Sequence, residues 1–225
     1  MAYDYALGFK DGSPDETRTS AGFSLIELLV VVMIILILSA ISIPYIYSYK
    51  SAYKSEDQSL KVMDLMRETS QLALSRRRSF RLEIDLTDNA ILVIDENNAG
   101  PDTLLKSIPL EPVNEVRMDV IPTGITKPDP PKYNDATFIT DMTGHRVGAA
   151  TVSGHKVWAA GFKSDGSVVN AAGIPSSVNI YVWPPKTAGS TTPRRKEEVR
   201  VITMFGGSGA IRYWKHDGTT FVPFN

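Results

Sequence analysis

The chain has 225 residues, a length that fits one globular domain with an appended segment. Its formal net charge of −1 gives no overall attraction to nucleic acid or to an anionic surface. The sequence contains no cysteine, which excludes disulfides, thiol nucleophiles and cysteine metal sites.

A polar leader, residues 1–22, precedes an apolar run from Phe23 to Ile43 that contains a single charge, Glu27. A helix of this length spans about 31 Å, which is close to the thickness of a bilayer core. We therefore predict a transmembrane helix over residues 23–44. Two other interpretations stay open: a signal peptide cut near residues 40–42, and a plain single-pass anchor. The anchor leaves Glu27 unexplained, because a carboxylate deep in a spanning helix costs about 2.5–3.5 kcal/mol.

The segment Gly22-Phe23-Ser24-Leu25-Ile26-Glu27, with the apolar run and Pro44 after it, resembles the processing site of type IV prepilins and type II secretion pseudopilins. In that family a membrane peptidase cuts after the glycine and methylates the new N-terminus. The resemblance implies cleavage between Gly22 and Phe23, N-methylation of Phe23, and roles in assembly for Glu27 and Pro44. It also implies three partners: prepilin peptidase, other pilin or pseudopilin subunits, and the inner membrane. The protein would then span the inner membrane once, with its globular domain in the periplasm.

Elementary chemistry agrees with this reading of the segment. A tight protease subsite accepts a residue without a side chain, as at Gly22. Cleavage leaves an amine on Phe23, one helical turn from Glu27. In a bundle of such helices the amine of one chain can neutralise the glutamate of another, which removes the cost of an isolated charge in an apolar layer. Pro44 lacks an amide donor and can kink or locally melt the helix.

Residues 45–78 continue as an amphipathic helix, since no glycine or proline interrupts them. The predicted core-facing stripe consists of Val62, Leu65, Met66, Thr69, Leu72 and Ala73. Residues 79–225 alternate with period two and contain the turn signals Asp165-Gly166 and Asp217-Gly218. The predicted strands are 80–86, 90–95, 104–110, 115–121, 137–140, 156–163, 178–183, 198–205, 210–215 and 220–224. The expected fold is α+β, with one long N-terminal helix packed on an antiparallel sheet.

Three segments of the β-rich region resemble the GspH/FimT-like minor pilins and pseudopilins. They are LALSRRR before FRLEIDL, WAAGFKSDGSV near residues 157–168, and VRVITMFGGSGAIR at 199–212. The resemblance implies a structural minor subunit of a type IV pilus or a type II secretion pseudopilus. Two alternatives stay open: a DNA-binding minor pilin for natural transformation, and a major pilin or membrane-anchored domain.

We find no pattern of catalytic or cofactor-binding residues. His145, His155 and His216 are too scattered to predict a metal site, and no Ser follows the G-x-S-x-G pattern. Residues 206–209 are glycine-rich, but they predict a turn between strands rather than a phosphate cradle. We therefore expect no enzymatic activity, cofactor or metal. The candidates for DNA binding are Arg194, Arg195, Lys196 and Arg212, with a solvated basic loop as the simpler interpretation.

Overall fold

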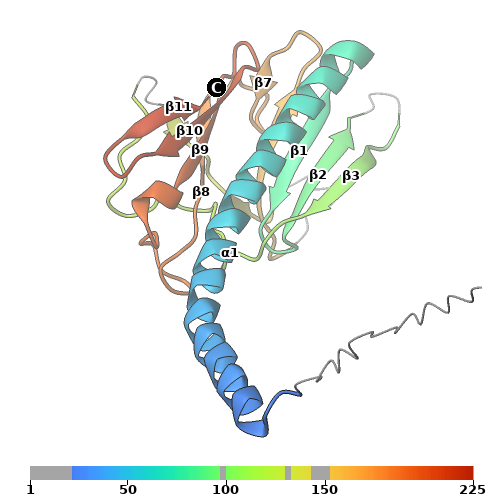
Figure 1. The fold of residues 1–225 in the computed structure, drawn as a ribbon. Coiled ribbons are helices and arrows are strands. Elements are labelled where there is room, and N and C mark those ends of the chain that lie inside the picture. Colours follow the sequence, from blue (N-terminus) through green and yellow to red (C-terminus); the bar gives the residue numbers. More distant parts are fainter. Residues whose placement is uncertain (1–21, 97–99, 130–132, 143–152, 225) are drawn as a thin grey trace, which may run out of the picture. The chain divides into compact units, whose positions relative to one another are not determined.

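The computed structural model describes residues 22–96, 100–129, 133–142 and 153–224, and the chain divides into two compact units, Met1–Tyr45 and Ile46–Asn225 (Figure 1). The predicted leader lies outside the described residues except for Gly22. The helix α1 spans Leu25–Arg76. The remaining elements are β1 (Phe80–Asp85), β2 (Ala90–Asp95), β3 (Thr103–Pro109), β4 (Asn134–Asp135), β5 (Ile139–Thr140), β6 (Lys156–Phe162), β7 (Val168–Val169), β8 (Val178–Val182), the 3-10 helix η1 (Lys196–Glu198), β9 (Arg200–Met204), β10 (Ile211–His216) and β11 (Phe221–Phe224).

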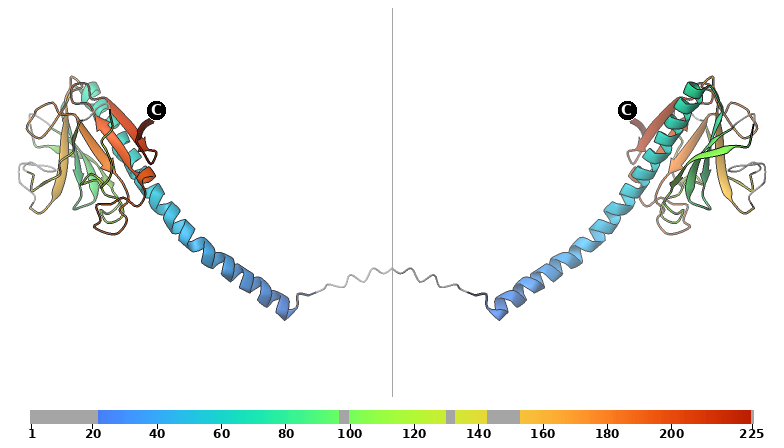
Figure 2. Two further views of the ribbon diagram at one scale, coloured as in Figure 1. Left: turned by 90° about the vertical axis from the view of Figure 1, so that its left-hand side faces the viewer. Right: turned by 90° about the vertical axis from the view of Figure 1, so that its right-hand side faces the viewer.

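The strands form two sheets, and the predicted α+β class is confirmed. One sheet has the order β3-β2-β1-β6-β5, with β7 also paired to β6, and the other has the order β11-β10-β9-β8-β4. Within the described residues, every strand pair is antiparallel except β4 with β8. The later part of α1 lies against both sheets, as the two views in Figure 2 show. The fold therefore contains two sheets around one helix, where the sequence predicted a single sheet.

The predicted apolar stripe of α1 forms the centre of the core. Its members Val62, Leu65, Met66, Thr69 and Ala73 are buried, and Leu72 is partly buried against them. They pack with alternate residues of β1, β6, β8 and β9, which present one face of each sheet to the helix. The apolar residues that recur with the helical period in α1 and those that alternate along the strands thus pack together in one core.

The helix ends at Arg76, two residues earlier than predicted. Arg77 has a φ of 52°, in the left-handed region, and the amide of Arg78 donates to the carbonyl of Ala73 at 3.3 Å. This is the long hydrogen bond of a Schellman cap, which satisfies a carbonyl in the last turn. The strand that follows can then begin at Phe80.

The predicted strand at 115–121 is wrong. Turns form there instead, with the amides of Glu115 and Val116 donating to the carbonyl of Pro112. Only a bridge between Arg117 and Trp183 remains of the expected pairing among the described residues. Arg117 explains the difference, because its guanidinium is buried and donates to Asp119 and to two carbonyls of the 184–196 loop. β4 and β7 were not predicted, since two residues give no periodic signal.

A polar clamp holds α1 to the second sheet near the start of the Ile46–Asn225 unit. Glu56 accepts from Arg200 and Lys215, each at 2.7 Å, and Ser59 is hydrogen-bonded to the Tyr213 hydroxyl at 2.8 Å. Burial opposes ionisation of Glu56, but the hydrogen bonds and charges of Lys215 and Arg200 outweigh it and lower the pKa of this carboxyl. The clamp fixes the rotation and register of the helix on the sheet.

Candidate processing site and assembly helix

The predicted cleavage site lies in an exposed, non-helical segment directly before α1. Gly22 and Phe23 are outside the helix, and Phe23 is 80% exposed. A protease must draw the chain through its active site in an extended form, so a bond outside a helix needs no local unfolding. The geometry therefore leaves the bond between Gly22 and Phe23 open to cleavage.

Gly22 has no structural reason to lack a side chain. A Cβ built on this residue would meet no described residue within 4 Å, and its φ lies outside the left-handed region. By contrast, a Cβ on Gly206 would approach the backbone nitrogen of Ser176 to 2.5 Å, and one on Gly209 would approach the Gly166 carbonyl oxygen to 2.5 Å. Close backbone packing thus explains Gly206 and Gly209, which lie in the turn between β9 and β10, whereas Gly207 has open space around it. The described part of the fold therefore does not require glycine at position 22, whereas a tight subsite of a peptidase would.

Ser24 caps the N-terminus of α1, a role that the sequence analysis missed. Its Oγ accepts from the amide of Glu27 at 3.2 Å, and its carbonyl accepts from the amide of Leu28 at 3.2 Å. The serine and the glutamate three residues later follow the S-x-x-E spacing of a capping box. This spacing is readable from the sequence and could have placed the helix start.

Glu27 lies in the first turn of α1 and is exposed. A carboxylate there interacts favourably with the partial positive charge of a helix N-terminus. No ion pair of Glu27 occurs within the described part of the chain. Its charge thus remains available to a partner, such as the amine that cleavage would create at Phe23 on a neighbouring chain.

The apolar run of α1 buries none of its surface within the described chain. The segment Leu25–Ile43 has a mean hydropathy of 3.0 and is 0% buried. By its length and composition this segment could cross a membrane. The core helix of a soluble protein would be mostly buried, which this segment is not. Its exposed leucines, isoleucines and valines require a lipid or a protein environment.

The helix α1 continues through Pro44 without interruption, so the backbone is not locally melted there. Beyond it, the tyrosines at 45, 49 and 53 are exposed, and the rings of Tyr49 and Tyr53 are 5.4 Å apart. Exposed aromatic side chains with a polar tip suit the boundary between lipid and water. Their position directly after the apolar run fits that boundary.

The structure does not gather the four candidate basic residues into one site. Arg194 forms a bidentate ion pair with Glu198, at 3.0 and 2.7 Å. The guanidinium of Arg212 lies over the rings of Phe205 and Trp214, at 5.7 and 5.4 Å from the centroids.

The location of the four residues separates them further. Arg212 pairs with Thr203, near the C-terminal end of β9, whereas the segment 194–196 leads into the other end of that strand. Arg200, at the start of β9, and Thr203, opposite Arg212, are three residues apart, which corresponds to about 10 Å along the strand. Arg195 and Lys196 are exposed, and no ion pair of theirs lies among the described residues.

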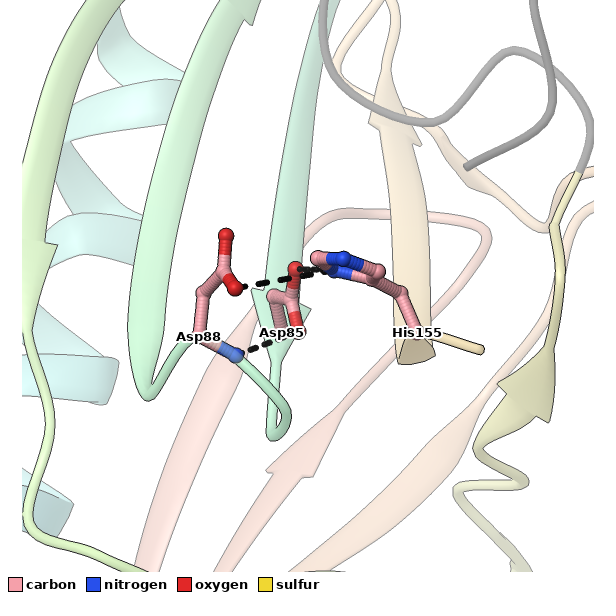
Figure 3. Close-up of side chains that lie close together, drawn as sticks. All are labelled: Asp85, Asp88 and His155. Atoms are coloured by element: carbon pink, nitrogen blue, oxygen red, sulfur yellow. Dashed lines mark hydrogen bonds and ion pairs between the residues drawn. The ribbon is translucent and has the colours of Figure 1, made fainter. Parts of the chain in front are cut away.

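One cluster of metal-ligating side chains escaped the sequence analysis. Asp85, Asp88 and His155 lie close together (Figure 3), although His155 is 70 residues from Asp85 in the chain. His216 is buried elsewhere, and His145 lies outside the described residues. The cluster forms only through the pairing of β1 with β6, which single-sequence spacing cannot reveal.

Comparison with known proteins identifies the N-terminal segment. A family model of the prokaryotic N-terminal methylation motif matches residues 17–43. No curated protein and no solved structure matches the chain. The matched segment contains the bond between Gly22 and Phe23, the charge of Glu27 and the apolar run. The motif therefore supports a type IV pilin-like family and indicates a protein that is processed by a prepilin peptidase and assembled with other pilin subunits.

Proposed function

We propose that the protein is a structural subunit of a type IV pilus or a type II secretion pseudopilus, and that its role is not enzymatic. Its precursor is cut between Gly22 and Phe23 by prepilin peptidase and methylated on Phe23. Residues 23–44 then hold it in the inner membrane, with the β-rich domain in the periplasm, until it joins the filament. The match of the methylation motif to residues 17–43 carries this proposal.

The structure supports the proposal through the apolar helix. Leu25–Ile43 exposes its apolar surface on every side, and a single carboxylate lies at its N-terminal end. A lipid bilayer satisfies the apolar surface but penalises the isolated carboxylate. A bundle of such helices from this and other pilin subunits satisfies both, because Glu27 can pair with the N-terminal amine of a neighbouring chain. Assembly is therefore the favoured state of this helix.

We further propose that the subunit is a minor one. The support is the resemblance of the β-rich segments to GspH/FimT-like proteins. DNA binding is the less favoured alternative, because Arg194 is already paired with Glu198 and Arg212 lies over two aromatic rings some distance away. A major pilin would differ in abundance, which the amount of this protein in purified filaments measures directly.

The decisive experiment is mass spectrometry of the N-terminus in cells with and without an active prepilin peptidase. We expect a mature chain that begins with methylated Phe23, and the full precursor in cells that lack the peptidase. Gly22→Val should leave the precursor uncut while leaving the fold unchanged, since space around Gly22 is open. A mature chain that begins at Ser42 or Ile43 would instead establish a signal peptide, and an uncut wild-type chain would establish a plain anchor.

A further inference from the structure

A buried histidine lies where the second sheet turns back into its edge strand. His216 is the last residue of β10, and its partner across the turn 217–220 is Phe221, the first residue of β11. The amide of His216 also donates to the carbonyl of Val199, directly before β9, at 3.2 Å. Among the described residues β11 pairs only with β10, so it forms one edge of this sheet (Figure 1). One ladder and one turn therefore hold β11 to the domain.

The ring of His216 accepts a hydrogen bond from the backbone of this turn. The amide of Gly218 donates to Nδ1 at 2.9 Å. A backbone amide can only donate, so Nδ1 carries no proton and the ring proton is on Nε2. His216 is 4% exposed, and the ring of Phe221 meets its ring edge to face, with 4.9 Å between the centroids. The turn thus requires the neutral form of this side chain.

The turn is closely fitted to its surroundings. Asp217 Oδ1 accepts from the amides of Thr219 and Thr220, each at 2.8 Å. Gly218 has a φ of 104°, and a Cβ at this residue would approach Glu197 Oε1 of η1 to 2.8 Å. The Gly218 amide is therefore confined between the turn and η1, and the loss of its acceptor would leave a partly buried donor unsatisfied.

From this geometry we infer that His216 is an acid-sensitive latch on the edge strand β11. Protonation of Nδ1 removes the acceptor of the Gly218 amide and places a positive charge on a side chain that is almost fully buried. Both changes oppose the native turn. In acid β11 then separates more often from β10, and β10 becomes the open edge of the sheet, with unpaired backbone groups that another strand can bind.

The groups that face the ring favour its neutral form on balance. Burial lowers the pKa of His216 and is the largest effect. Asp217 in the turn and Glu197 in η1 raise this pKa, whereas Lys196 in η1 lowers it. β11 contributes the ring of Phe221, which carries no charge. The net result is a pKa below the ordinary value of 6.5.

The other charged side chains next to His216 in this sheet are directed to the helix. Lys215 and Arg200 both bind Glu56 of α1, each at 2.7 Å. Alternate residues of a strand face opposite sides of the sheet, so the ring of His216 lies on the other side. On that side β8 contributes Tyr181, and burial raises the pKa of its hydroxyl, which keeps it uncharged at neutral and acid pH.

The lowered pKa sets the sign of the pH dependence. The open hairpin takes up a proton near pH 6.5, whereas the closed hairpin resists it. The latch is therefore at full strength above pH 6.5 and weakens as the pH falls through the folded value. The limit for a fall to pH 5.5 is about a tenfold rise in the opening equilibrium, reached when only the open form is protonated. Carboxyl groups, with ordinary pKa values of about 4, stay ionised over this range.

The test is hydrogen exchange of the full-length protein in detergent, followed by mass spectrometry at pH 7.5 and 5.5 and corrected for intrinsic exchange rates. We expect the opening equilibrium of residues 216–224 to rise about three- to tenfold at the lower pH, while that of β8 stays constant. His216→Gln offers a carbonyl acceptor that does not titrate, so its opening should not depend on pH. His155→Gln is the matched control, because His155 is the other described histidine and lies beside the first sheet. It should keep the pH dependence of the wild type.

NMR of the histidine rings in the wild type keeps the proposal falsifiable if His216→Gln folds poorly. The ring of His216 should be protonated on Nε2 at pH 7.5, and its titration midpoint should lie below 6.5. A neutral ring with its proton on Nδ1, or a midpoint at or above 6.5, would overturn the proposal. The same holds if the opening of residues 216–224 rises less than about threefold, if His216→Gln keeps the pH dependence, or if His155→Gln abolishes it.

Discussion

The charge of Glu27 is predicted to act in assembly and not in membrane insertion, and Glu27→Val separates the two roles. In the isolated chain this change removes a favourable interaction with the helix N-terminus, worth about 0.3–1 kcal/mol for an exposed group. It also removes an insertion cost of about 2.5–3.5 kcal/mol if the carboxylate is deep in the bilayer. The balance favours insertion by roughly 2 kcal/mol. The variant should therefore reach the membrane at least as well as the wild type.

Incorporation into the filament should change in the opposite direction. Removal of one partner from a buried ion pair costs about 3–5 kcal/mol, because the other charge stays buried and unpaired. In the proposed filament that other charge is the amine of a neighbouring Phe23. Even a loss of about 1.4 kcal/mol corresponds to a factor of ten in an equilibrium. We expect the incorporated fraction of Glu27→Val to fall at least about tenfold.

The assay is the share of mature protein in sheared filaments relative to that left in membranes. Glu27→Asp keeps the charge but shortens its reach, so it should be intermediate. Ser24→Ala is the control for the helix cap, since it removes the hydrogen bond to the Glu27 amide and leaves the carboxylate in place. Its expected cost is about 1 kcal/mol of helix stability. Equal incorporation of wild type and Glu27→Val would refute the charge-pairing mechanism, and an equal loss in Ser24→Ala would reassign Glu27 to capping.

Four further predictions concern the β-rich unit. A fragment from Ile46 onward should melt cooperatively in calorimetry without a membrane, because it contains the whole buried core. Met66→Ala should lower the free energy of unfolding by about 2–5 kcal/mol in denaturant titrations, since this side chain is fully buried. Glu56→Gln should destabilise the fragment at pH 7. Because the folded pKa of Glu56 is lowered, its contribution is present above its ordinary pKa of 4.5 and is lost as the pH falls through the folded value, so the difference from wild type should shrink in acid. Finally, neutralising the four candidate basic residues together should leave retention on DNA at low salt unchanged, and a loss of retention would revive the DNA-binding alternative.

The sequence predicted those parts of the fold in which a local period decides the structure. The α1 stripe through Met66 is buried as expected, and Phe80, Leu82 and Ile84 of β1 all face the core. Simple alternation would place the intervening residue Glu83 in solvent, but its side chain is fully buried, with Arg81 donating to it at 2.7 Å. Alternation reports which residues share a face, but it does not report whether the second face is also covered. That depends on contacts between residues far apart in the chain.

The same limit applies to the candidate sites. A processing site could be proposed from the sequence because all of its residues lie within one short segment, and the methylation-motif model matches that segment. Asp85 and His155 could not be connected in advance, because only the register of β1 on β6 brings them together. Arg117 shows the converse case, since its 115–121 segment alternates like a strand. Its buried guanidinium instead binds carbonyls of a distant loop, and turns replace the ladder.

Because the N-terminal segment is exposed, substitutions in it should affect interactions with other molecules and not the folding of the β-rich unit. Every side chain from Phe23 to Ile43 is exposed, and a side chain added at Gly22 would touch none of the residues that the structure describes. Substitutions here should leave the core of the Ile46–Asn225 unit unchanged, because that core contains none of these residues. A defect of Gly22→Val can then be assigned to the peptidase, and a defect of Glu27→Val to neighbouring subunits. If either substitution lowered the Tm of the β-rich unit, this separation would fail, and the two residues would have to be studied as part of its fold.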